Sequence, residues 1–219
     1  KTIDEIDILE AQRLAEAQDA QSPVNTENWE AAKRTLKQGI REMQGSIDIS
    51  QYEIPEASIL KFYLEAIFES PELFYVVSAC SYTYIPSSSG RIISSVSPCY
   101  TVNGSDRVDR LTDEDKQEIR QQQTVLEQKL AEIMQKVRSD CSDLTKAMYL
   151  HDYIAVHCEY DSTLTFRDAY RMLINGTGVC QGYMLAYRLL LNRAGVTSSW
   201  VQSNSLRHVW SLVQLDGAW

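Results

Sequence analysis

The sequence contains no run of about 18 apolar residues, which a membrane-spanning helix requires. It is also poor in basic residues: 21 Lys and Arg stand against 30 Asp and Glu, which gives a net charge of −9 at pH 7. Because contacts with phosphate groups need clustered Lys and Arg, this balance argues against nucleic acid as the main partner. Only three histidines occur, and no group of His, Cys, Asp and Glu has the spacing of a zinc site. The sequence therefore predicts no membrane span, no metal and no other cofactor.

Internal repeats and long low-complexity linkers are also missing from the sequence. With 219 residues, 44% of them hydrophobic and 23% charged, the chain is globular and long enough for one large domain or two small ones. The first residue is Lys1 rather than methionine, so the sequence carries no information on a leader or on the compartment.

Residues 1–138 are predicted to form an N-terminal α+β region of helices and one Tyr-rich hairpin. Apolar residues recur at helical spacing over four segments of this region. These are residues 3–20, a segment capped by Thr26 or Asn28 that runs to about Met43, one that begins at Pro55, and residues 112–137. The third segment has Leu60, Phe62, Tyr63 and Ile67 as its apolar side, and Leu126, Leu130, Ile133 and Met134 form the buried stripe of the fourth. Thr112 is the expected cap of the fourth helix, whose charged side is expected to face solvent.

The predicted hairpin pairs residues 74–85 with residues 91–102, which are rich in Tyr, Val and Ile. If Ser89 and Gly90 are the central turn residues, Cys80 lies directly opposite Cys99, at a separation that suits a disulfide. Such a bridge would favour an extracellular or periplasmic setting, whereas a four-residue loop would undo this register. Alternate tyrosines on one face would suit a platform for peptide or sugar, although tyrosine also suits any half-buried strand. Cys141 and Cys158 are interpreted as structural thiols.

Cys180 follows a glycine-rich break, in the run Gly-Thr-Gly-Val-Cys-Gln-Gly-Tyr over residues 176–183. Apolar residues then recur at helical spacing, so Cys180 is expected in the first turn of a helix. The unpaired N–H groups there favour a thiolate and are suited to holding an oxyanion. Gly182 leaves room on this turn for close approach of another backbone. A lone cysteine is nevertheless more often a small buried apolar residue than a nucleophile.

The sequence from His208 predicts a strand, and Asp216-Gly217 predicts a turn at its end. A histidine on a strand beside a helix-starting cysteine places an imidazole against a thiol, as nucleophilic catalysis requires. His151 and His157 lie on one predicted helix, and their spacing of six residues is wrong for two ligands on one face. We interpret them as ordinary surface or core histidines.

These motifs, in this order, resemble the transglutaminase-like cysteine superfamily, and most closely its bacterial, often extracellular branch. The resemblance rests on residues 168–187, on Leu-Leu-Asn-Arg-Ala-Gly-Val from Leu190, and on His-Val-Trp-Ser-Leu-Val-Gln-Leu-Asp-Gly-Ala-Trp from His208. The helix that ends in Glu159-Tyr160-Asp161 also fits. The resemblance covers residues 142–219 and implies an α+β, papain-like core, with the nucleophile on a helix packed against an antiparallel sheet. It also implies that Cys180 is the nucleophile and His208 the general base, although the cysteine-to-histidine interval is far shorter than in papain itself.

The family's third catalytic member is an aspartate about fifteen residues after the histidine, and it is expected beyond Trp219. The core of residues 142–219 is thus expected to be C-terminally incomplete against the family pattern. If Asp216-Gly217 is a two-residue turn, Leu215 pairs with Ala218, and Asp216 lies about 26 Å from His208 at roughly 3.3 Å per residue. Asp216 is therefore interpreted as a turn residue.

Two functions remain open. The first is thiol-dependent hydrolysis or acyl transfer at amide bonds of a peptide or protein substrate, as a protease, deamidase or transglutaminase using Cys180 and His208. The second is a binding module for protein or carbohydrate that keeps the fold without turnover. An extracellular or cell-surface location is expected from the resemblance.

Overall fold

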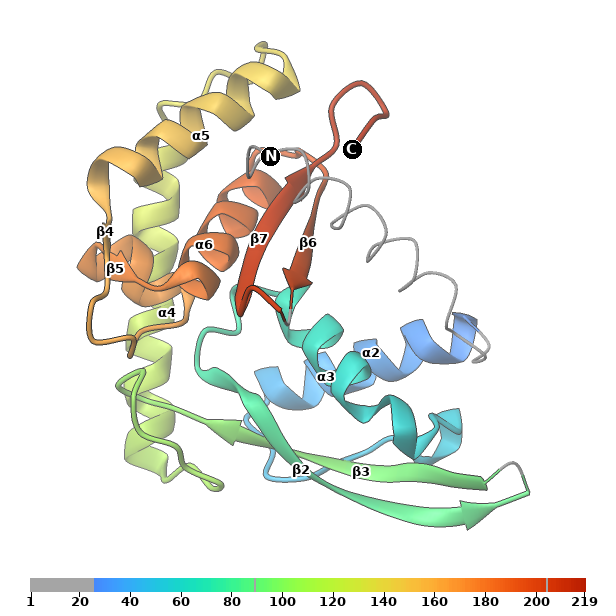
Figure 1. Cartoon of the computed structure of the whole chain (residues 1–219). Coiled ribbons are helices and arrows are strands. Elements are labelled where there is room, and N and C mark those ends of the chain that lie inside the picture. The colour runs from blue at the N-terminus through green and yellow to red at the C-terminus, as the bar shows by residue number, and fades with distance from the viewer. Residues whose placement is uncertain (1–25, 89, 204) are drawn as a thin grey trace. The chain divides into compact units, whose positions relative to one another are not determined.

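The computed structural model describes residues 26–88, 90–203 and 205–219, so the helix expected over residues 3–20 lies outside the described residues. Two compact units are present: one comprises the described residues up to Val125, and the other includes the described residues from Leu126 to Trp219. Each unit combines helices with antiparallel strands, which confirms a mixed α+β fold (Figure 1). The domain boundary expected between residues 138 and 142 stays a prediction.

In the first unit, two helices pack on each other through their apolar sides. They are α2 (Thr26–Arg41) and α3 (Ile59–Phe68), which follows two short 3-10 turns, Ser50–Tyr52 and Glu56–Ser58. Trp29 of α2 meets Phe62 of α3 edge to face, with ring centroids 5.3 Å apart. Both predicted helices are confirmed, but Leu60 is 65% exposed. Its assignment to the apolar side was wrong, because the buried side of α3 is formed by Phe62, Tyr63, Ala66, Ile67 and Phe68.

The hairpin of this unit pairs β2 (Val76–Ser87) with β3 (Gly90–Tyr100), and the short β1 (Ile47–Asp48) lies on the other side of β3. The predicted hairpin is confirmed, but the predicted register is wrong. Ser87 pairs with Gly90, so the turn lies one residue earlier than expected, and a shift between Thr83 and Tyr84 changes the pairing again. Cys80 consequently faces Pro98 instead of Cys99, and both cysteines are free thiols.

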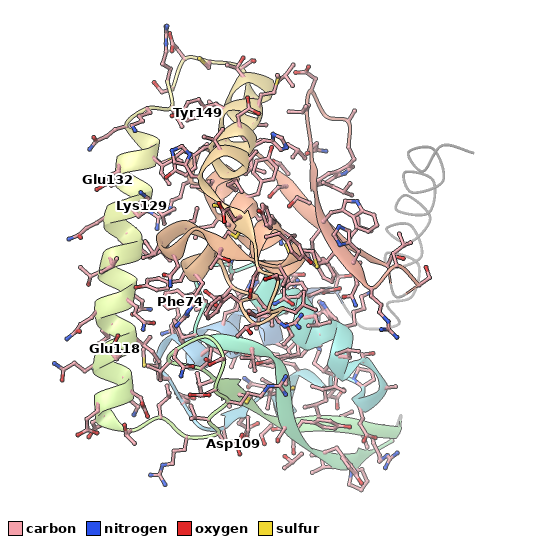
Figure 2. All side chains as sticks on the ribbon, turned by 60° about the vertical axis from the view of Figure 1, so that its left-hand side comes forward. Phe74, Asp109, Glu118, Lys129, Glu132 and Tyr149 are labelled. Atoms are coloured by element: carbon pink, nitrogen blue, oxygen red, sulfur yellow. The ribbon has the colours of Figure 1, made fainter. Side chains whose placement is uncertain are left out.

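The long helix α4 (Asp113–Met134) begins where the sequence predicted. The Thr112 hydroxyl accepts the N–H of Asp115 at 3.1 Å, and the Asp115 carboxylate accepts the N–H of Thr112 at 2.8 Å. Leu126, Leu130 and Ile133 are buried, as expected of the apolar stripe. Charged side chains, among them Glu118, Lys129 and Glu132, lie along α4 (Figure 2), and both glutamates are exposed as predicted.

The second unit is built around α6 (Cys180–Arg193), which packs against α5 (Asp143–His157) and against β7 (His208–Val213) (Figure 1). β7 pairs antiparallel with β6 (Ser198–Ser203). The chain between α5 and α6 forms β4 (Glu159–Tyr160), a π-helical turn (Arg171–Asn175) and β5 (Thr177–Gly178), and β4 and β5 pair in parallel. The helix predicted after Cys180 and the strand predicted at His208 are thus both present.

Candidate active site

Cys180 is the first residue of α6, and its side chain is half-buried. The preceding residue, Val179, is extended (φ −90°, ψ −177°) and provides no side-chain cap for the helix. The first N–H groups of a helix have no partner within the helix and carry its positive dipole end. The thiol therefore lies where a negative charge, on sulfur or on a bound oxygen, is favoured.

Two glycines before Cys180 allow the chain to reach this position. Gly176 has φ +70°, and a Cβ there would lie 3.0 Å from the carbonyl oxygen of His157. At Gly178 a Cβ would lie 2.9 Å from the Met172 sulfur. The glycine-rich run thus permits the close approach of β5 to the end of α5 and to the π-helical turn.

The loop that follows β4 is fixed against the start of α6 by one carboxylate. Asp161 accepts the backbone N–H groups of Thr163, Thr165 and Phe166 at 2.8–2.9 Å. The Thr163 hydroxyl also donates to it, and together these hydrogen bonds lower the pKa of Asp161 to about 2. The Phe166 carbonyl in turn accepts the N–H of Val179 at 2.9 Å, so the loop is tied to the residue before Cys180. The sequence predicted Asp161 at the end of a helix, but α5 ends at His157. The capping role of Asp161 was not predicted, although Asp-Ser-Thr-Leu-Thr is a spacing typical of side-chain-capped turns.

A buried ion pair lies on the same stretch of chain. Asp168 accepts the N–H of Arg171 at 2.9 Å, and its other oxygen lies 3.5 Å from the Arg171 guanidinium. Burial raises the pKa of the Asp168 carboxyl, and the charge of Arg171 offsets part of that rise. The Asp168 carbonyl would lie 3.5 Å from a Cβ at Gly182, so Gly182 lets this loop rest on the first turn of α6.

His208 is the first residue of β7, opposite Ser203 of β6, and it is exposed. Its imidazole stacks on Trp210, which is two residues further along the same face, with centroids 5.7 Å apart and planes at 25°. This stacking limits the orientations open to the ring.

Cys180 and His208 line one pocket with a volume of about 420 Å³. Its floor is a stripe of α6, and α5, β4 and β7 supply its walls. The floor consists of Cys180, Tyr183, Met184 and Tyr187, and the walls consist of His151, Ile154, Ala155, Tyr160, His208, Val209, Trp210 and Ser211. The fold therefore brings together the two residues that the sequence analysis singled out.

The two remaining histidines lie in different surroundings. His151 lines the pocket, with its ring 6.2 Å from that of Tyr187 and its Nδ1 3.0 Å from the Asp152 carboxylate. His157 does not line it: its ring stacks on Tyr153 at 4.2 Å, and its Nδ1 hydrogen-bonds with the Tyr153 carbonyl. The place of His151 in the pocket was not predicted, because the face that α5 turns toward α6 depends on packing between the two helices.

Asp216 lies in the predicted turn. Asp216 and Gly217 have φ of 52° and 81°, and Leu215 and Ala218 exchange backbone hydrogen bonds at 2.8 and 2.9 Å. Within the part of the chain that the structure describes, no three His, Cys, Asp or Glu residues are grouped to hold a metal ion. The same part contains no helix long and apolar enough to cross a membrane.

No protein-family model matches the chain, and no curated protein matches it. Among solved structures, the chain is similar to a protein from Cytophaga hutchinsonii described as a "putative cysteine protease", with 12% sequence identity and a TM-score of 0.33. The match covers 64% of this chain and 59% of that one, so the chain spans about three fifths of that protein's length.

Proposed function

We propose that this chain has a transglutaminase-like core and catalyses thiol-dependent hydrolysis or acyl transfer at amide bonds of peptides or proteins. Cys180 is the proposed nucleophile and His208 the proposed general base. The observation that carries the proposal is that Cys180, at the N-terminus of α6, and His208, at the start of β7, line the same pocket.

The proposed reaction has two stages. His208 takes the thiol proton, and the Cys180 sulfur attacks the amide carbon, so that a C–S bond forms and the carbonyl electrons move to oxygen. The N–H groups of the first turn of α6 stabilise this oxyanion. When the intermediate collapses, the C–N bond breaks, and the departing amine takes the proton held by His208, which leaves a thioester on Cys180.

The second stage depends on the acceptor. Water attacks the thioester and releases a carboxylic acid and the free thiol, which is the outcome of a protease or a deamidase. A lysine amine would instead form a new amide bond, as a transglutaminase does. The acceptor stays open, because it depends on how well the occupied pocket excludes water.

Alkylation of Cys180 by iodoacetamide between pH 5 and 9 tests the proposal. We expect Cys180 to react at pH 6 about tenfold faster in the unchanged protein than in His208→Ala, because the variant loses the group that takes the thiol proton. Peptide mass mapping separates Cys180 from Cys141, a half-buried thiol outside the pocket that serves as an internal reference. Equal alkylation rates of Cys180 in the two proteins would reject the proposed enzymatic function.

A binding module without turnover is the second candidate, and one observation favours it. Tyr82 and Tyr84 of β2 are 40% and 47% exposed, and the Arg91 guanidinium lies 4.7 Å from the centre of the Tyr84 ring. Exposed rings on one strand suit contacts with peptide or sugar. If this candidate is correct, Tyr82→Ala and Tyr84→Ala abolish binding of the peptide or sugar ligand. Cys180 then reacts with iodoacetamide at the same rate as Cys141.

A further inference from the structure

We infer that the pocket beside Cys180 accepts a large uncharged side chain, aromatic or branched aliphatic, from the residue whose backbone carbonyl reacts, and that Ala155 sets the width of the pocket. This inference rests on the proposed function and adds the class of substrate.

The hydroxyl groups of three lining residues are engaged with backbone carbonyls. Tyr183 donates to the carbonyl of Cys158 at 3.2 Å, and Tyr187 donates to that of Ala147 at 3.0 Å. Ser211 donates to the carbonyl of Met184 at 3.4 Å. The two tyrosines therefore present their rings to the pocket, and these hydrogen bonds to backbone hold the rings in place.

Among the described residues that line the pocket, none is Asp, Glu, Lys or Arg. A charged side chain that entered would lose part of its hydration, and the lining offers it no carboxylate, ammonium or guanidinium group as a partner, which is unfavourable. An apolar side chain would contact Ile154, Met184 and Val209, and its removal from water carries no such penalty. The lining thus discriminates against charge of either sign.

The dimensions of the pocket suit a short piece of peptide. Its volume of about 420 Å³ lies toward the lower end of the roughly 300–1,000 Å³ found for small-ligand pockets. Along the floor, Cys180 and Tyr187 are seven residues apart, which is about 10 Å at ~1.5 Å per residue. That length matches about three residues of an extended chain at ~3.3 Å each. With the thiol at one end, the remaining length holds one large side chain and its neighbour.

Ala155 is the smallest side chain on the α5 wall, and it is exposed. A larger residue there would project into the pocket without disturbing the core of the unit. Val156 is the next residue of the same helix, is 78% exposed and does not line the pocket. The two positions differ by about 100° around the helix, so Val156 provides a matched control.

N-acetyl aminoacyl chloromethyl ketones with Phe, Leu, Ala, Glu or Lys side chains test the inference. The Cys180 thiolate displaces chloride, so a C–S bond forms as the C–Cl bond breaks, and mass mapping reports the rate without any need for turnover. Each rate is divided by the rate of the same probe with free glutathione. We expect the Phe and Leu probes to label Cys180 at least tenfold faster than the Glu and Lys probes. Repulsion by the net charge of −9 would slow the Glu probe alone, so slow labelling by both charged probes identifies the pocket lining as the cause.

Ala155→Phe is expected to lower the rate of the Phe probe, relative to that of iodoacetamide, at least tenfold. Val156→Phe should leave this ratio unchanged, and thermal melting should confirm that both variants are folded. If the alkylation of Cys180 by iodoacetamide is slower in His208→Ala, but the five chloromethyl ketones label Cys180 at equal rates, the inference is overturned and the proposed function stands. If the Phe and Leu probes react faster than the charged probes, but His208→Ala does not slow the alkylation of Cys180, the pocket is selective and the proposed function fails. Labelling of Cys180 by none of the reagents would overturn both.

Discussion

The Asp161 carboxylate accepts the N–H of Phe166 at 2.9 Å, and the carbonyl of the same Phe166 accepts the N–H of Val179, the residue before Cys180. One side chain on the loop after β4 is therefore connected through two hydrogen bonds to the residue that precedes the proposed nucleophile. This path gives the loop of residues 161–168 a defined task, which is to fix the start of α6.

Asp161→Asn is expected to lower the melting temperature at pH 7 by a few degrees and to slow the alkylation of Cys180. The variant loses a charged acceptor of three backbone N–H groups, so the loop and the start of α6 become less rigid. Asp216→Asn is the control, because Asp216 lies in the distant turn before Ala218. A Cys180 rate equal to that of the unchanged protein would show that the loop does not position α6.

Asp161 also predicts a pH dependence of stability. Its pKa is about 2 in the folded protein and about 3.9 in an unfolded chain, so the unfolded state takes up the proton first as the pH falls. The contribution of Asp161 is complete above about pH 5 and disappears as the pH approaches 2. Asp168, whose pKa is raised by burial, acts in the opposite direction, and the comparison with Asp161→Asn isolates Asp161. Urea midpoints between pH 5 and 2 should fall less steeply in the variant; parallel curves would contradict this assignment.

Gly176→Ala and Gly195→Ala separate backbone strain from steric clash. Both glycines have φ near +70°, but a Cβ at Gly195 would meet open space, whereas at Gly176 it would lie 3.0 Å from the His157 carbonyl oxygen. We expect Gly195→Ala to lower the free energy of unfolding by about 1 kcal/mol, which is the cost of the left-handed conformation. Gly176→Ala should cost about 2–3 kcal/mol and also slow the alkylation of Cys180. Equal costs in urea unfolding would show that β5 moves away from His157 freely.

Much of this architecture was predictable, because local signals are strong where the site begins. The glycines before Cys180 and the apolar repeat after it predicted α6, and Asp216-Gly217 predicted the turn between Leu215 and Ala218. Such signals depend on residues close together in the sequence.

The errors arose where local signals allow more than one arrangement or where distant parts of the chain decide the outcome. The hairpin register depends on a turn one residue earlier than expected and on the shift at Thr83, and an error there changes which residue faces Cys80. Leu60 is as apolar as its neighbours, but α2 covers the opposite side of α3. The place of His151 in the pocket depends on how α5 lies on α6, which no motif of α5 encodes.

Variants of the buried pair Asp168 and Arg171 distinguish the effect of the Asp168 charge on stability from the effect of its hydrogen bond with the Arg171 N–H. Asp168→Asn keeps an oxygen for the N–H of Arg171 but removes the negative charge beside the Arg171 side chain, which is 4% exposed. We expect a loss of about 3 kcal/mol in the free energy of unfolding, because the buried guanidinium loses the carboxylate charge beside it. The double variant Asp168→Leu with Arg171→Met removes both charges and should recover at least half of this loss. Urea unfolding of the three proteins decides the matter: if the double variant is less stable than Asp168→Asn, the polar contacts of the pair, rather than its charge balance, stabilise the turn that leads to Cys180.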